Sequence, residues 1–395
     1  MATDRPKLHA RTSLLNNPKS RSVIFQLTLA AIVIALIYGA VTNAIDHLQR
    51  AHIASGFGFW HNAAGFEISQ TLIPYSSNVS TYGQAFWVGL LNTLLVAGLG
   101  IVLATALGFV VGIARLSSNW LVSRAASGYV ETIRNIPLLL QLLFWYNAVL
   151  KALPETRQSL SLFGSIFLNN RGLVLPAPVT QPGFAAVGIA FVLALVLAIA
   201  FAFWARKRQE QTGAQAPVGI VSLALIIALP LLTFLIAGRP LSFDFPQAGR
   251  FNIAGGMEVL PEFAALLLGL SIYTGTFIAE VVRAGILAVS KGQTEAAYSL
   301  GLRPNATLRL IVVPQAMRVI IPPLTSQYLN LIKNSSLAVA IGYPDLVQVF
   351  TGTVLNQTGQ AVEVVAITML VYLTISLVTS LSMNIYNSRI ALVER

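Results

Sequence analysis

The sequence predicts an all-α, polytopic membrane protein with about eight transmembrane helices. Of its 395 residues, 55% are hydrophobic and only 10% are charged, whereas soluble domains carry about 25% charged residues. The mean hydropathy is +0.73. Several windows of about 20 apolar residues are long enough to cross the roughly 30 Å hydrocarbon core of a bilayer. These observations exclude a soluble domain.

Eight apolar segments can be assigned as spans. The third begins at Ile136-Pro137 and contains Gln141, and the seventh contains Pro322-Pro323 and several polar residues. Because such residues lower the hydropathy of a span, seven or fewer spans is an open alternative. The expected spans are residues 23–45, 87–114, 135–153, 184–204, 217–238, 262–285, 318–341 and 364–386.

The first span is expected to remain in the mature chain. It follows a polar tail, residues 1–22, that carries five Lys or Arg residues. The apolar run at 23–45 is longer than the h-region of a signal peptide, and no convincing small-residue cleavage site follows it. We therefore expect a signal-anchor helix that is not cleaved.

The distribution of positive charge predicts the orientation. The net charge is +11, but the basic residues are spread over short loops rather than gathered in one patch, so nucleic acid is not an expected partner. With the N-terminus inside, roughly 18 Lys and Arg residues fall in cytoplasmic segments against about 6 outside, as the positive-inside rule requires. Both termini, including residues 391–395, are then cytoplasmic.

The composition gives no support for a metal site or for catalysis. The chain has no Cys, which excludes disulfides and thiolate metal sites. His9, His47, His52 and His61 lack the spacing of a metal cluster and are expected to be solvated loop residues. No phosphate-binding loop ending in Gly-Lys-Ser/Thr occurs. The spans contain neither paired catalytic carboxylates nor a His/Asp constellation, so we expect no cofactor and no enzyme activity in this chain.

The most informative motif lies in the polar loop 286–317, between the sixth and seventh spans. Thr294 can cap the N-terminus of a short helix that contains Glu295-Ala296-Ala297. Gly301 lies where this helix should end, because glycine readily adopts the left-handed conformation of a helix C-terminus.

A second short helix is expected after the glycine. Asn305–Leu310 can begin it, and Pro314 predicts a break before the seventh span. The expected product is a helix, a glycine turn and a second helix along the cytoplasmic membrane surface. The alternative is an ordinary amphipathic loop, which would not require this fixed spacing.

This loop resembles the EAA loop of the membrane subunits of bacterial ATP-binding cassette (ABC) importers. Val313 stands where the pattern usually has Leu, a conservative departure. The positions that match the motif are Glu295, Ala296, Ala297, Gly301, Ile311 and Pro314.

The sequences around the loop narrow the resemblance. Segments 131–141, 273–293 and 331–337 are similar to the polar amino-acid branch of these permeases. The resemblance implies a five-helix type I importer core, to which the first span and the pair at 184–238 are added, as in the larger membrane subunits of general L-amino-acid importers. The expected division is 1–22, cytoplasmic tail; 23–82, extra helix and periplasmic loop; 83–153, first part of the core; 154–256, periplasmic loops with an inserted helix pair; 257–390, second part of the core with the coupling loop; and 391–395, cytoplasmic end.

The resemblance also implies a function and partners. The chain would be a permease subunit that moves L-amino acids across the bacterial inner membrane. A separate cytoplasmic ABC ATPase dimer would use the ATP and hold the hairpin. A periplasmic amino-acid-binding protein would deliver the substrate. A second permease subunit would complete the path, either another copy or, as the enlarged form favours, a related chain.

Polar side chains within spans indicate where substrate could pass, because such groups are costly in hydrocarbon. Pro322-Pro323 and Ser335-Ser336 suggest a partly unwound seventh span, which would expose backbone groups to a ligand. We expect Lys333 near the substrate carboxylate; the alternatives are that it caps helix carbonyls or pairs with Glu280. The candidate path residues are Tyr273, Thr276 and Glu280 in the sixth span and Gln327, Asn330, Lys333, Ser335 and Ser336 in the seventh.

Two further charge pairs lie at the predicted cytoplasmic ends of spans. Glu131 with Arg134, and Glu280 with Arg283, are interpreted as interfacial salt bridges.

Other classes of membrane protein are weighed against the importer. A secondary transporter or channel would need no such hairpin and would retain uptake without an ATPase. A membrane-embedded enzyme would need a catalytic cluster, and a membrane anchor leaves the hairpin unexplained. Among importers, an amino acid is favoured over a sugar or an inorganic ion; one amino acid or many stays open.

Overall fold

The computed structural model describes residues 18–50, 55–249 and 252–390 of the chain. In these residues seven helices are long and apolar enough to cross a membrane, and a helix pair bent by 103° gives up to eight spans. The predicted helical membrane fold is thereby confirmed. Residues 1–17, the end at 391–395, His9 and His52 lie outside the described residues. The chain divides into two units, Met1–Gly89 with Leu346–Thr374, and Leu90–Asp345 with Ile375–Arg395.

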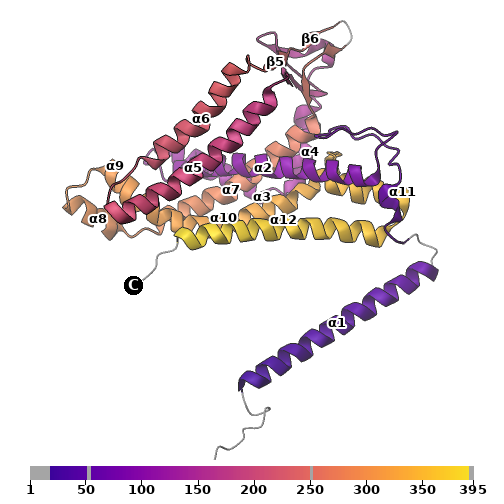
Figure 1. The fold of residues 1–395 in the computed structure, drawn as a ribbon, viewed down its shortest axis with the longest axis horizontal. Coiled ribbons are helices and arrows are strands. Elements are labelled where there is room, and N and C mark those ends of the chain that lie inside the picture. The colour runs from indigo at the N-terminus through magenta and orange to yellow at the C-terminus, as the bar shows by residue number, and fades with distance from the viewer. Residues whose placement is uncertain (1–17, 51–54, 250–251, 391–395) are drawn as a thin grey trace, which may run out of the picture. The chain divides into compact units, whose positions relative to one another are not determined.

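The first unit contains the N-terminal helix and a folded loop that follows it (Figure 1). Its predicted span at 23–45 lies inside the longer helix α1, every described side chain of which is exposed or half-buried. The elements of this unit are α1 (Pro18–Arg50), the 3₁₀-helix η2 (Gly58–His61), the start of α2 (Tyr82–Ala114), the π-helix η7 (Val347–Val354), α11 (Leu355–Thr358) and the first part of α12 (Ala361–Ile390).

Aromatic rings hold the loop before α2 in place. The ring of Phe350 lies 6.3 Å from that of Phe59 and 5.3 Å from that of Phe86. The Tyr75 hydroxyl donates to the carbonyl of Phe66 at 2.9 Å, and burial, with the charge of Glu67, raises the pKa of Tyr75 to about 12. The ring contacts and this hydrogen bond make the loop an ordered element.

The second unit holds the core helices. Its first part contains the rest of α2 and the broken third span, α3 (Trp120–Asn135), α4 (Leu138–Leu143) and the π-helix η3 (Phe144–Leu150). Its second part contains α7 (Pro261–Leu287), α8 (Lys291–Ser299), α9 (Pro304–Thr307), the π-helix η5 (Leu308–Val312), α10 (Val313–Asn334) and the 3₁₀-helix η6 (Ser335–Ile341). The end of α12 completes the unit.

Small residues let these helices approach closely. A Cβ atom added at Gly108 of α2 would lie 2.4 Å from Cγ2 of Ile278 in α7, and one at Gly112 would lie 2.8 Å from the carbonyl oxygen of Ala279. Gly285 of α7 lies similarly against Ile320 of α10. Glycines four residues apart permit the close helix crossings that stabilise membrane bundles. They fix α7 between α2 and α10.

Gln141 stabilises the bend of the third span. Pro137 has no backbone N–H, so the carbonyl of Ile133 loses its usual helical donor. The Gln141 side-chain amide donates to the carbonyls of Ile133 and Ile136, at 2.9 Å each. The third span is therefore a bent helix pair, Trp120–Asn135 with Leu138–Leu150, whereas the sequence predicted a single span over 135–153.

We expect Gln141→Leu to destabilise the protein by about 1–3 kcal/mol, because two carbonyls near the bend lose a donor. The thermal unfolding of the purified permease measures this loss. Asn147→Leu, which removes a side chain that donates only to the exposed turn before it, is the control. An unchanged unfolding temperature in Gln141→Leu would show that the bend does not depend on this amide.

Short strands, which the sequence analysis did not find, flank the inserted helix pair. A four-stranded antiparallel sheet has the order β1-β2-β3-β8, and the pairs β4–β5 and β6–β7 stand beside it. The strands are β1 (Leu160–Leu162), β2 (Ile166–Asn169), β3 (Gly172–Leu175), β4 (Ala177–Thr180), β5 (Leu241–Asp244), β6 (Gln247–Ala248), β7 (Ile253–Ala254) and β8 (Met257–Val259). We call residues 154–180, 240–249 and 252–259 the strand lobe.

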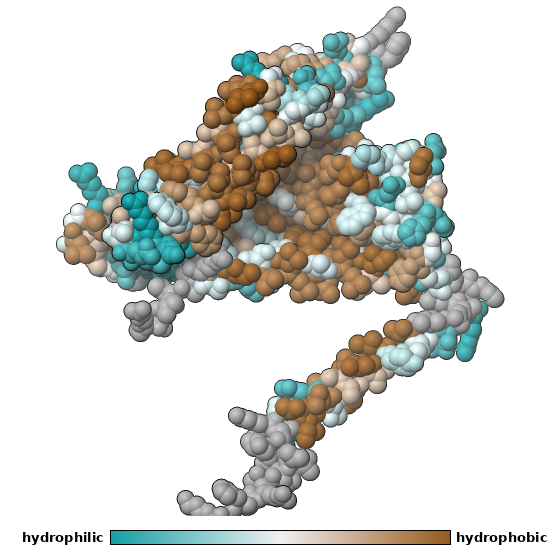
Figure 2. All heavy atoms as spheres, viewed as in Figure 1, coloured by the Kyte–Doolittle hydropathy of each residue, from teal (hydrophilic) through white to brown (hydrophobic). Residues whose placement is uncertain are grey.

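The helices α5 (Phe184–Thr212) and α6 (Val218–Ile236) pack side by side as an antiparallel hairpin, one end of which lies next to the strands (Figure 1). Ala190, Ala194 and Ala198 are buried at a spacing of four residues, which places them on one face of α5. The other faces are apolar and exposed, and Figure 2 shows them in brown. The predicted spans 184–204 and 217–238 are thus confirmed as an apolar helix pair.

The seventh span differs from its prediction at its prolines. The helix runs without a break from Pro304 to Ile341, so the expected breaks at Pro314 and at Pro322-Pro323 are wrong. At η5 the amide of Val313 donates to the carbonyl of Leu308, five residues back, and this wider turn accommodates Pro314. Prolines within a membrane helix are tolerated where local adjustments and neighbouring helices stabilise the backbone. The irregular part lies instead at η6, from Ser335 onward.

Candidate coupling hairpin and substrate path

The polar loop after α7 folds as the predicted helix, glycine turn and helix. Its first helix, α8, begins at Lys291 with Ser290 as the residue before it. The prediction that Thr294 caps this helix is wrong, because Thr294 lies one turn inside it. The second helix, α9, begins at Pro304, a residue favoured at the first helical position.

Gly301 terminates α8 in the left-handed conformation, with a φ of +76°. The amide of Gly301 donates to the carbonyl of Tyr298 at 2.9 Å, and the amide of Leu302 to that of Ala297 at 3.1 Å. These two bonds define a Schellman motif, in which a left-handed residue satisfies the last carbonyls of a helix. A Cβ atom at Gly301 would contact nothing within 4 Å. The requirement for glycine is therefore conformational and not a matter of space.

The motif residues of α8 lie on two sides of the helix. Ala297 is buried against the rest of the hairpin, whereas Glu295 and Ala296 are exposed. The Glu295 carboxylate makes no hydrogen bond or ion pair within the described part of the chain. The small Ala296 and the acidic Glu295 therefore form a surface that another protein can contact.

Large apolar side chains extend this exposed surface. The side chain of Leu300 is 82% exposed, and three more apolar residues of the hairpin are at least half exposed; they are Tyr298, Leu308 and Leu310. Leu308 and Leu310 belong to the candidate membrane span Pro304–Ile341, so Tyr298 and Leu300 are the large apolar groups that α8 and its turn present to another protein. Of the remaining motif positions, Ile311 is half-buried within η5 and Pro314 is exposed on α10.

The candidate path residues of α7 do not form one polar surface in the structure. Thr276 is fully buried, and its hydroxyl donates to the carbonyl of Tyr273 at 2.6 Å, so it is not available to a ligand. The Tyr273 ring packs on Phe277, with centroids 5.0 Å apart. Glu280 pairs with Arg283 at 2.6 Å, as interpreted, and also with Arg115, the residue that follows α2.

We call the row of candidate path residues Gln327, Asn330 and Lys333 the stripe on α10. Gln327 is half-buried, and Asn330 and Lys333 are exposed; in the described residues none of the three side chains has a polar partner. Lys333 therefore neither caps helix carbonyls nor pairs with Glu280. Ser335 and Ser336 donate to the carbonyls of Ile332 and Lys333 at 2.8 and 2.7 Å, and so stabilise the start of η6.

Charged residues around Glu280 form a cluster that the sequence analysis found only in part. A hollow of about 440 Å³ is lined by Glu280, Arg115, Glu131 and Arg134, among others. The guanidinium of Arg134 lies over the Phe277 ring, 4.7 Å from its centroid. No ion pair joins Glu131 to Arg134 in the residues that the structure describes, so that interpretation is wrong. Arg115 was missed because its partner is distant in sequence.

The comparisons with known proteins agree with these features. Residues 218–392 match the family described as binding-protein-dependent transport system inner membrane component. The chain is 53% identical to the general L-amino acid transport system permease protein AapQ of Rhizobium johnstonii, covering 100% of this chain and 99% of AapQ.

Two further relatives extend the match. The putative amino-acid ABC transporter permease protein YhdX of Escherichia coli is 53% identical over 96% of each chain. The glutamate/glutamine/aspartate/asparagine transport system permease protein BztB of Rhodobacter capsulatus is 42% identical over the full length of both. All three relatives are named as permease proteins. The chain therefore belongs to the family of multi-pass membrane permease subunits of amino-acid ABC importers.

Proposed function

We propose that this chain forms part of a path for L-amino acids across the bacterial inner membrane and accepts several of them. The observation that carries the proposal is the 53% identity with AapQ, which extends over 100% of this chain and 99% of AapQ. The name of AapQ specifies general L-amino acid transport. BztB, also matched over its full length, is named for four acidic or amide amino acids. The core of the path comprises residues 83–153 and 257–390, with the inserted segment 154–256 between them.

The hairpin α8–α9 is proposed to dock into an ATPase subunit. Exposed Leu300, Tyr298 and Ala296 supply an apolar contact, and Glu295 supplies an unpaired charge at its edge. ATP is bound and hydrolysed by that separate ATPase dimer, since this chain has no phosphate-binding loop. Closure of the dimer would move α7 and α10, which the hairpin joins.

The remaining partners and the orientation follow from the same proposal. A periplasmic amino-acid-binding protein delivers the substrate, and a second, related permease faces the stripe of Gln327, Asn330 and Lys333. Both termini lie in the cytoplasm, as the distribution of basic residues favours.

Uptake into vesicles tests the proposal. The permease, its second subunit and the ATPase are reconstituted, and the binding protein is added with a panel of radiolabelled L-amino acids. We expect ATP-dependent uptake of several amino acids, glutamate and glutamine among them. Uptake without the ATPase, or uptake of sugars or inorganic ions in place of amino acids, would contradict it.

Lys333→Met is expected to weaken substrate affinity during uptake by roughly 10- to 100-fold, because one charge-assisted hydrogen bond to the substrate carboxylate is lost. The KM for the amino acid, measured in uptake assays with a saturating concentration of a transport-competent binding protein, reports this change. Lys207→Met removes the same charge from the exposed end of α5 and serves as the control. Unaltered affinity and an unaltered substrate range in Lys333→Met would place the substrate elsewhere.

A further inference from the structure

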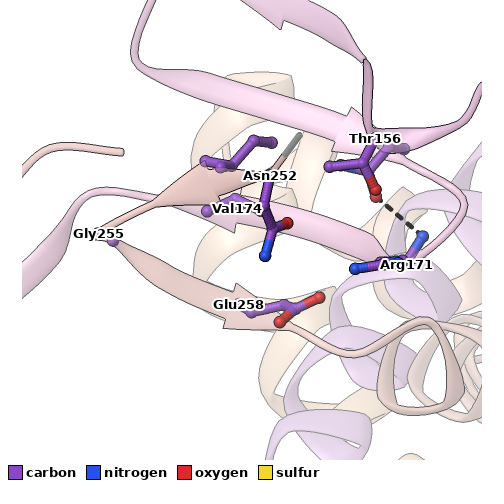
Figure 3. A pocket seen from close by; sticks show the side chains of 9 residues that line it. Thr156, Arg171, Val174, Asn252, Gly255 and Glu258 are labelled. Atoms are coloured by element: carbon purple, nitrogen blue, oxygen red, sulfur yellow. Dashed lines mark hydrogen bonds between the residues drawn. The ribbon is translucent and has the colours of Figure 1, made fainter. Parts of the chain in front are cut away.

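The strand lobe contains a polar cavity whose lining includes none of the candidate path residues. Its volume is about 230 Å³, and it lies between the turn before β3, strand β8 and residues 252–256. Figure 3 shows the side chains of Arg171, Asn252 and Glu258 pointing toward one another from these three segments. Thr156 lies at its border. Chain segments from both sides of the inserted helix hairpin therefore build this one site.

The cavity presents opposite charges without neutralising them. The guanidinium of Arg171 and the carboxylate of Glu258 both line it. Within the described ranges neither group makes an ion pair or a side-chain hydrogen bond. A donor of fixed positive charge and an acceptor of negative charge are thus both available to one small ligand.

The turn that carries Arg171 is held in a single conformation. Asn169 is buried; its Oδ1 accepts the amide of Arg171 at 2.8 Å, and its Nδ2 donates to the hydroxyl of Ser159 at 3.0 Å. Gly172 follows with a φ of +136°, and a Cβ atom there would lie 2.2 Å from the carbonyl oxygen of Val259. Only glycine fits this close approach of β3 to β8.

The register of the paired strands also sets the position of Glu258. Val174 of β3 pairs with Glu258 of β8, so their side chains share the face that lines the cavity. The two charges are therefore presented by a paired sheet and a tight turn, which is the rigid support that a binding site needs.

We infer that this cavity binds a free α-amino acid as its zwitterion, with the carboxylate on Arg171 and the ammonium on Glu258. Asn252, whose amide can donate and accept, supplies a third polar contact. The choice of an amino acid over another zwitterion rests on the proposed function. The site is separate from the stripe on α10 and would hold substrate outside the membrane-spanning helices.

The cavity has the size for such a ligand. Its volume of about 230 Å³ is several times the roughly 30 Å³ that one water molecule occupies in the liquid, so it can admit a ligand of several non-hydrogen atoms. A neighbouring hollow of about 430 Å³ shares Thr156 and Arg171, and it offers room for a longer side chain. Because the charges are accessible to water, we expect weak binding, with a Kd of about 1 mM.

Binding to the purified full-length permease, without binding protein or ATPase, tests the inference. The probe is L-glutamine, observed by saturation-transfer difference NMR in nanodiscs. We expect Arg171→Gln and Glu258→Gln each to weaken binding roughly fivefold or more. Lys151→Gln, an exposed cation near the lobe that does not line the cavity, is expected to bind as the unaltered protein does.

Two analogues make the test independent of the variants. 4-Aminobutanamide lacks the α-carboxylate of glutamine and glutaramate lacks its α-ammonium, so each should bind the unaltered permease roughly fivefold more weakly or worse. Equal binding of all three compounds would overturn the zwitterion site. A second result would also overturn the zwitterion site: the permease binds no glutamine, and the binding protein docks more weakly to Arg171→Gln than to the unaltered permease. The cavity would then be a contact for the binding protein. If vesicles take up no amino acid but the permease binds glutamine here, the transport proposal alone fails.

Discussion

Gly301→Val is expected to lower ATP-driven uptake by roughly 10- to 30-fold while the protein still inserts in the membrane. A β-branched residue is strongly disfavoured at a φ of +76°, with a cost of about 1–2 kcal/mol or more for the left-handed conformation. No side chain obstructs a Cβ atom at this position, so the protein core is unaffected. The strain would open the Schellman turn and turn α8 away from the ATPase. Uptake and membrane content, measured in the same vesicles, separate the two effects.

Substitution by Asn is the matched control for this prediction. Asn tolerates the left-handed conformation far better than Val while adding a side chain of similar size. Gly301→Asn should therefore keep most of the uptake, and Gly301→Ala should fall between the two variants. If Val were fully active, or if Asn were as inactive as Val, the conformational explanation of this glycine would be wrong.

Glu280→Gln is expected to destabilise the permease by about 1–3 kcal/mol and to reduce uptake. The substitution leaves Arg115 and Arg283 close together without the carboxylate that both contact, and an unpaired, partly buried charge is costly. Arg115 is the more buried of the two cations, with 11% of its side chain exposed. Thermal unfolding of the purified permease gives the stability change, and vesicle uptake gives the functional one.

Glu131→Gln is the control for this cluster. Glu131 lines the same hollow but forms no ion pair in the described residues, so its loss should change stability by less than about 0.5 kcal/mol. Combining Arg115→Met with Glu280→Gln should recover part of the stability, because the more buried unpaired cation is removed. An equal effect of the two carboxylate substitutions would show that pairing is not what Glu280 contributes.

Local signals explain what the sequence predicted well. Long apolar segments identified the helices α1, α2, α5, α6, α7 and α12, because hydrocarbon must be matched by about 20 apolar residues. The turn at Gly301 was found because glycine is the residue that adopts a positive φ without strain. Both features depend on residues that are neighbours in sequence.

Features that depend on distant contacts were missed. The strands β3 and β8 pair across the inserted helix hairpin, and each is too short to give a periodic pattern. The pair of Arg115 with Glu280 joins the turn after α2 to α7. Pro314 and Pro322-Pro323 predicted breaks that the wide turn at η5 and the continuous helix α10 do not have. In each case tertiary packing decided the outcome.

Reaction of a single introduced thiol tests most directly whether the hairpin is the cytoplasmic contact for an ATPase. The chain has no Cys, so Leu300→Cys and, separately, Val79→Cys each give one reporter at a side chain that is 82% or 81% exposed. A membrane-impermeant maleimide applied to intact cells should label Val79→Cys and not Leu300→Cys. In inverted membranes Leu300→Cys should react, and adding the ATPase subunit should slow that reaction roughly tenfold or more. Labelling of Leu300→Cys from outside, or an unchanged rate with the ATPase bound, would contradict the proposed role of this hairpin.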